Sequence, residues 1–353
     1  MTNFLVLGPG CGGNFWTNGN IAISTGVLNV AQPTTISITV KNTNNEPVRL
    51  NELQATVCAF NTMHSFNSAS ILPSLQLTNP LVWDNVFPFP NDLVIAAGGS
   101  ATVALPSWTP QASDIHHFDN VPGAAFENLP KTSLHCCIFA NCTGSFPPVN
   151  TGAVTDDGAL VNWNSAVSGS FCSDTHHGQL NTSLHRLSNQ FHMSIPFYAG
   201  SAGEREIGKA KVFLREVAFD ASAQPELMAM IKRAGFGALP IQPAAVPARV
   251  AGLARFRGVV ERVKEKLEEV ADEIKEGAEH LIGHWAYEDD ENDPQTPRSV
   301  LTVNLTANAL QPLLLKVAVD KDDAVGTVHV FDVVQANANG TSGGFRLATV
   351  NAP

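Results

Sequence analysis

The chain has 353 residues, of which 44% are hydrophobic and 15% are charged, and its formal net charge is -11. This composition is typical of a folded globular chain rather than a disordered one, and the length is enough for about two domains. The negative charge argues against nucleic acids and anionic membranes as partners, because neither offers a charge of opposite sign.

The sequence predicts neither a membrane span nor a secretory leader. The first residues lack a basic segment followed by an apolar run, and no stretch reaches the roughly 18 apolar residues that a spanning helix needs. We therefore expect a protein that is cytoplasmic or that reaches the cell surface by leaderless export.

Short alternating strands characterise the first 200 residues. Residues 34–41 place Ile36, Ile38 and Val40 on one face, which predicts a half-buried strand. Further strands are expected at 50–60, 92–97, 101–105, 133–140 and 189–197. Short strands separated by Gly and Pro predict an antiparallel β-sandwich over residues 1–200. We expect a long loop containing Cys and His at about 142–187 in this domain.

The strand pattern restarts at 209–219, after a Gly-containing joint, and resumes at 300–350. We interpret these flanks as one second sandwich, residues 204–353, that is split by an insertion at 221–290. Within the insertion, residues 226–233 predict a short helix.

A long amphipathic helix is predicted from Val250 onward. Apolar residues recur at spacings of three and four, which is the pattern of a helix with one apolar stripe. The stripe, a candidate interaction surface, contains Leu253, Phe256, Val260, Val263, Leu267, Val270, Ile274, Leu281 and Trp285. The predicted fold is therefore mainly β, with two immunoglobulin-like antiparallel sandwiches, the second carrying a long α-helical insertion.

The string QPTTISITVKNTNNEPVRLNELQATVC at 32–58 resembles the opening of bacterial immunoglobulin-like modules of the CARDB type. The later TVHVFDVVQ, followed by Gly343 and Gly344, is similar to the last hairpin of such modules. This resemblance, scattered over about half of the chain, implies a structural or adhesive role without catalysis. Neither the loop at 142–187 nor the helix belongs to the pattern of that family.

Five of the six cysteines lie between Cys58 and Cys172, within the first predicted domain. Cys58, Trp83 and the pair Cys136 and Cys137 follow one another in the Cys, Trp, Cys order of immunoglobulin domains. This order predicts a disulfide between the two sheets. In a reducing compartment the same cysteines would be small buried hydrophobic residues. The candidates are Cys58 with Cys136 or Cys137, and a loop bridge between Cys142 and Cys172.

A zinc site is the sharper hypothesis for the loop. Cys142, Cys172, His176 and His177 supply thiolate and imidazole, which are the ligands that zinc favours. The paired ligand spacings of known zinc modules are absent, so a plain surface loop is the alternative. Zinc is the cofactor that we consider, and otherwise we expect none.

No catalytic motif supports an enzyme. The first hypothesis is a non-catalytic structural or assembly protein that forms a homo-oligomer or larger assembly, or docks to a protein partner, through sandwich edges and the helix. The second is a surface or carbohydrate-binding module that stacks its ligand on Trp163 and Phe171. The third is a metal-dependent enzyme built on the Cys and His cluster.

Overall fold

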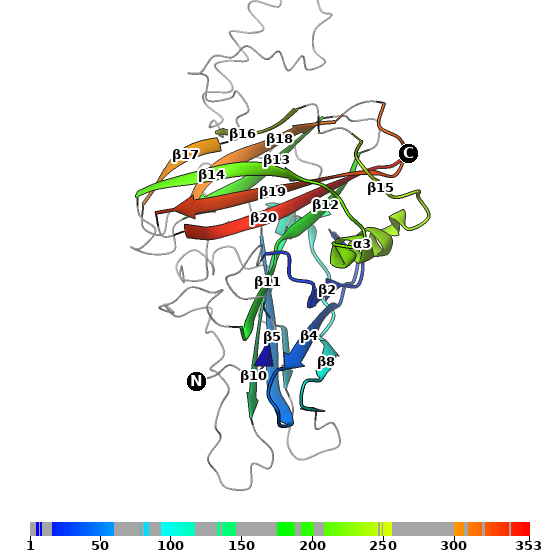
Figure 1. The fold of residues 1–353 in the computed structure, drawn as a ribbon, viewed down its shortest axis with the longest axis vertical. Coiled ribbons are helices and arrows are strands. Elements are labelled where there is room, and N and C mark those ends of the chain that lie inside the picture. The colour runs from blue at the N-terminus through cyan, green and yellow to red at the C-terminus, as the bar shows by residue number, and fades with distance from the viewer. Residues whose placement is uncertain are drawn as a thin grey trace, which may run out of the picture.

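β-strands make up most of the chain in the computed structural model (Figure 1). The structure describes residues 5–6, 8, 16–59, 78, 81–84, 93–116, 133–134, 136–145, 175–187, 192–200, 208–245, 248, 250–255, 300–306, 310–319, 322–338 and 340–353. The predicted mainly β class is therefore confirmed.

The N-terminal half consists of two facing sheets and a small ribbon. The first sheet contains β1 (Leu5–Val6), β2 (Ile21–Ile23), β4 (Ile36–Asn42) and β8 (Ser100–Ala104). The second contains β5 (Val48–Ala59), β6 (Leu81–Asp84), β7 (Val94–Ile95), β10 (Cys136–Ser145) and β11 (His177–Leu180). The ribbon pairs β3 (Leu28–Asn29) with β9 (Ser133–Leu134), and a short helix, α2, spans Ala112–His116.

The alternating pattern of the sequence explains this half. Ile36, Ile38 and Val40 of β4 are fully buried and pack in one hydrophobic cluster with Leu53 and Val57 of β5. Because successive side chains of a strand point to opposite faces, these residues all face the space between the two sheets. The strands predicted at 34–41 and 50–60 are thus confirmed.

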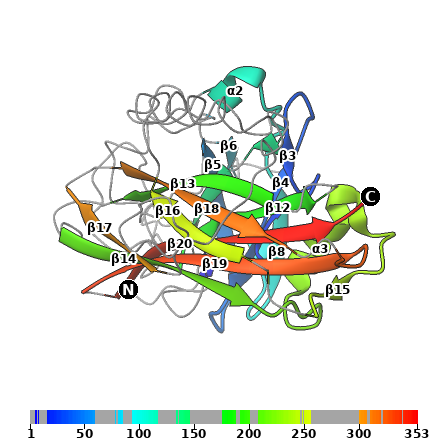
Figure 2. The ribbon, with the colours of Figure 1, turned by 90° about the horizontal axis from the view of Figure 1, so that it is seen from above.

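The C-terminal half is a second sandwich. Its larger sheet has the order β12 (Thr182–Leu187), β20 (Gly340–Asn351), β19 (Thr327–Asn337), β14 (Gly208–Val217) and β17 (Val300–Leu305), and β15 (Gln242–Pro243) also pairs with β19. The smaller sheet has the order β13 (His192–Gly200), β18 (Leu310–Ala318) and β16 (Val250–Arg255). Figure 2 shows both layers from above. Phe197 of β13 and Phe345 of β20 meet between them with ring centroids 5.1 Å apart.

Strand β19 joins the two halves because it is buried on both faces. Its Phe331 and Val333 lie in the core of the C-terminal sandwich. Its Val328 and Val330 belong to the cluster that also contains Ile36 of the N-terminal half. One hydrophobic cluster therefore extends through both halves, and the two are packed as a single body in which the strands of one half run across those of the other (Figure 1).

The helix α3 (Pro225–Ile231) lies where the two halves meet (Figure 1). Pro225 stands at its first turn, where a missing N–H costs nothing, and Leu227, Met230 and Ile231 bury one face. A π-helical turn, η4 (Lys232–Phe236), continues it. The short helix predicted at 226–233 is confirmed.

Three predicted boundaries are wrong. Residues 250–255, where the long helix was expected to start, form β16, so Leu253 lies opposite Leu315 of β18 in a sheet. The loop expected at 142–187 is wrong at both ends, because 142–145 belong to β10, 177–180 to β11 and 182–187 to β12. The sheet pairings also place β12 and β13 in the C-terminal half, so the chain passes between the halves at Asn181 rather than at 200–204.

Candidate functional site

The junction between the halves is tied together by Trp16 and Asn181. Trp16 is 1% exposed, and its carbonyl oxygen accepts a 2.8 Å hydrogen bond from the Asn181 N–H. The Asn181 side-chain amide donates to the Gly344 carbonyl at 3.1 Å, and the Asn181 backbone carbonyl accepts from the Arg346 N–H at 2.9 Å. Asn181 therefore links the N-terminal segment to β20 at the crossing point of the chain.

A buried ion pair lies on the same face of the larger sheet. Nε and Nη2 of Arg346 donate to the two carboxylate oxygens of Asp332 at 2.7 and 2.9 Å. Arg215 on β14 adds a third contact at 3.1 Å, although its side chain is 57% exposed. Since the Asp332 side chain is fully buried, this bidentate pair satisfies a charge that would otherwise be costly to desolvate.

A buried histidine, His329, lies between two carboxylates. Its Nδ1 is 3.1 Å from Glu216 and its Nε2 is 2.9 Å from Asp323, and the side chain is 2% exposed. Carboxylates only accept hydrogen bonds, so both ring nitrogens must carry a proton to make these contacts. Burial favours the neutral ring, but the hydrogen bonds and negative charges of Glu216 and Asp323 outweigh it and raise the pKa of His329.

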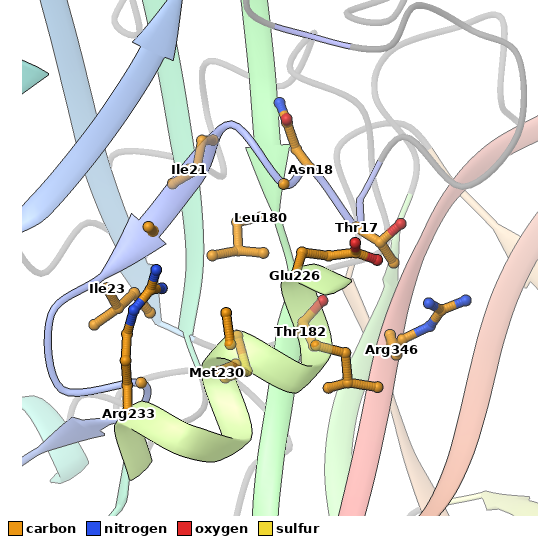
Figure 3. A pocket seen from close by; sticks show the side chains of 15 residues that line it. Thr17, Asn18, Ile21, Ile23, Leu180, Thr182, Glu226, Met230, Arg233 and Arg346 are labelled. Carbon is orange, nitrogen blue, oxygen red and sulfur yellow. The ribbon is translucent and has the colours of Figure 1, made fainter. Parts of the chain in front are cut away.

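A small cavity of about 110 Å³ opens between α3, β2 and the start of β12 (Figure 3). Its floor is apolar and includes Ile21, Leu180 and Met230. Its rim carries Glu226, whose side chain points toward Thr17 in Figure 3, and also Arg233 and Arg346. The cavity can hold a few water molecules or a very small polar group.

A larger, open groove of about 540 Å³ borders β12. Residues of β12, of the segment after α3, of the β3 ribbon and of the chain end line it, among them Val27, Leu184, Arg186, Phe236, Leu239 and Ala352. The groove therefore combines apolar side chains with polar ones, among them Asn29, His185 and the exposed cation Arg186.

The residues predicted to bind metal are brought together only in part. The Cys142 N–H donates to the His176 carbonyl at 3.1 Å, and its thiol lies 3.5 Å from the same oxygen. Cys142 and His176 thus meet through the backbone, while Cys172 lies outside the described residues. In the described ranges, no three side chains of His, Cys, Asp or Glu form a group that could hold a metal ion. The zinc site stays a prediction.

The cysteines of the predicted disulfide face each other in an unexpected way. Cys58 on β5 and Cys137 on β10 lie directly opposite each other in one sheet rather than in two facing sheets. Cys136 lies opposite Ala59, and Cys142 lies opposite Leu53. Cys58, Cys137 and Cys142 are buried and form no disulfide with one another, and burial raises the pKa of the Cys58 thiol above its ordinary value. The expected bridge between sheets is therefore wrong for this pair.

The other predicted interaction residues lie outside the part of the chain that the structure describes. This holds for the helix stripe from Phe256 to Trp285 and for the stacking candidates Trp163 and Phe171. Among the helices that the structure describes, none is long and apolar enough to cross a membrane.

Sequence reasoning missed the residues that build the junction. The available signal was Asp332, a carboxylate in the middle of the apolar run HVFDVV, which indicates a buried partner. The alternating segment 182–187 was also hidden, because it was assigned to the long loop. Nothing in the local sequence marks Trp16 or Asn181.

No family model and no curated protein matches this chain. A red sea bream transglutaminase structure aligns with 94% of this chain and 31% of its own, at 8% identity and a TM-score of 0.20. The collagen adhesin of S. aureus aligns over 94% of this chain and 91% of its own, at 6% identity and a TM-score of 0.22. CfaE, the adhesive subunit of the CFA/I fimbria of enterotoxigenic Escherichia coli, aligns over 99% and 87%, at 8% identity and 0.21.

This chain thus spans less than a third of the length of the transglutaminase chain. At such low TM-scores and identities these alignments carry no argument about the fold or the function. The resemblance to CARDB-type modules therefore stays a prediction.

Proposed function

We propose that this chain is a non-catalytic structural or assembly protein, built on immunoglobulin-like sandwiches, that self-associates or docks to a protein partner through a sandwich edge. The observation that carries the proposal is the edge strand β12. It ends the larger sheet of the C-terminal half and borders an open groove that is lined by both apolar and polar side chains. Edge strands and apolar grooves are the surfaces through which β proteins commonly bind other chains.

The organisation of the buried charges supports the non-catalytic part of the proposal. Asp332 and Arg346 neutralise each other, and His329 bridges Glu216 and Asp323. These groups link β14, β19, β20 and the segment before β19 to one another, which is a structural use of charge. A rigid body with its charges committed to internal links is suited to present a surface to a partner.

Light scattering of the full chain over a wide range of concentrations, together with electron microscopy, tests this proposal. We expect a molar mass that rises with concentration, or ordered assemblies. Cross-linking in the source cells adds a second readout, with Lys232, two residues before the groove-lining Ala234, as the expected site. A strictly monomeric chain that forms no cross-link to another protein would contradict the proposal.

A further inference from the structure

We propose that the groove beside β12 binds one extended peptide segment of a partner protein, which adds to the larger sheet as a strand and places an acidic side chain next to Arg186. This inference rests on the proposed docking function and names the site and the chemistry of the partner.

The backbone of β12 shows which of its groups face outward. In the parallel pairing of β12 with β20, the Arg346 N–H donates to the Asn181 carbonyl, and the Ala352 N–H donates to the Leu187 carbonyl. Backbone groups of a strand alternate between its two sides, so residues 183 and 185 also face β20. The N–H and C=O groups of Leu184 and Arg186 then point to the open side. No strand among the described residues pairs with that side of β12.

The groove provides walls for such a strand. Phe236 and Leu239 lie on one side, Val27 on another, and all three are partly buried against the main hydrophobic cluster. The groove volume of about 540 Å³ lies within the roughly 300–1,000 Å³ that is usual for binding sites. Apolar side chains of an added strand would bury themselves against these walls, while its backbone would pair with Leu184 and Arg186.

The charge of the groove indicates the chemistry of the partner. Arg186 is exposed and makes no ion pair with any other described residue. A carboxylate on the added strand would form a charge-assisted hydrogen bond with its guanidinium group. The partner segment therefore combines apolar residues, which fill the groove, with at least one Asp or Glu.

A second copy of this chain fits the groove less well than a single strand. The β12 edge is flanked by the wall of Phe236 and Leu239, which a whole sheet edge would have to pass. Two copies with a formal charge of -11 each would also repel at long range. An isolated extended segment does not have to pass the wall, and with a single carboxylate it is repelled far less than a second copy.

The test uses a fluorescein-labelled peptide of sequence Thr-Val-Thr-Asp-Val-Thr-Val and the full chain. We expect binding by fluorescence anisotropy and slower hydrogen exchange at the amides of Leu184 and Arg186. Arg186→Glu, which reverses an exposed charge, should weaken binding about tenfold. Lys41→Glu makes the same change in net charge at an exposed position of β4 that does not line the groove, and it should leave the affinity unchanged. A peptide with N-methylated backbone amides should not bind, because it cannot pair with the edge.

The outcomes separate this inference from the proposed function. If the full chain assembles or cross-links to a partner but the peptide neither binds nor slows exchange at Leu184 and Arg186, the groove assignment is wrong and docking elsewhere stands. Equal binding by the N-methylated peptide or by Arg186→Glu would overturn strand pairing or the charge contact, respectively. If Arg186→Glu abolishes self-association instead, the occupant is a second copy, which overturns the partner named here.

Discussion

The indole ring of Trp16 lies against Gly344 so closely that a β-carbon at position 344 would meet Cζ2 of the ring at 2.7 Å. The ring also packs on Val334, so it covers the outer face of β19 and β20 at the junction. Glycine is required here by the close approach of the indole, because no other residue leaves the ring in place.

Gly344→Ala should therefore destabilise the protein by about 1–3 kcal/mol, the usual cost of overpacking a tight contact. Urea unfolding measures the change. In a Trp16→Ala background the same substitution should cost much less, because the obstructing ring is absent. Equal costs in both backgrounds would show that the contact between Trp16 and Gly344 does not carry the effect.

Asp332→Asn should cost about 3–5 kcal/mol of unfolding free energy, because it leaves the buried guanidinium of Arg346 without its counter-charge. Arg215→Met removes the exposed contact to the same carboxylate and should cost less than about 1 kcal/mol. Chemical denaturation of both variants provides the comparison. Similar costs for the two variants would contradict the assignment of Arg346 as the main partner.

His329 predicts a dependence of stability on pH. Its pKa in the folded state is raised above the unfolded value of about 6.5, so the protonated ring stabilises the fold fully below that pH. This contribution is lost as the pH rises through the folded pKa. Denaturation measured from mildly acidic to alkaline pH should therefore show a decline that is shallower in His329→Gln. A decline of the same size in the variant would assign it to other groups.

The burial of three thiols predicts that they react slowly with alkylating reagents in the native protein. Cys58, Cys137 and Cys142 should resist alkylation in the native protein and react on unfolding, because burial excludes the reagent. At Cys58 burial also raises the pKa of the thiol and so disfavours the reactive thiolate. Peptide mapping by mass spectrometry follows each residue separately. Cys58 and Cys137 that stay unreactive in denaturant until a reductant is added would show that they are bridged.

The sequence predicts the strands that alternate clearly between apolar and polar residues. It does not predict the strand pairings and the groove, which depend on contacts between distant segments. Residues 34–41, 209–219 and the final hairpin alternate around a buried face, and the structure forms β4, β14, β19 and β20 there. A period of two is a local signal, so it can be read without knowledge of the fold.

The segment VAGLAR at 250–255 shows the limit of local reading. Its apolar spacing fits the start of the predicted helix with its apolar stripe, but in the structure this segment pairs with β18. Pairing with a strand about sixty residues away decides the conformation of this segment, and a short apolar run does not indicate that pairing. The groove was missed for the same reason, since it combines residues from β12, the β3 ribbon and the segment after α3.

The position of β19 and β20 has a consequence for synthesis of the chain. These two strands occupy the middle of the larger sheet, yet they follow β12, β14 and β17 in the sequence. During synthesis the outer strands β12, β14 and β17 therefore leave the ribosome before the central strands β19 and β20. Until then the apolar residues of the outer strands cannot be buried in the complete sheet. Until β19 and β20 are synthesised, the outer strands expose apolar surface and unpaired edges, which favours aggregation.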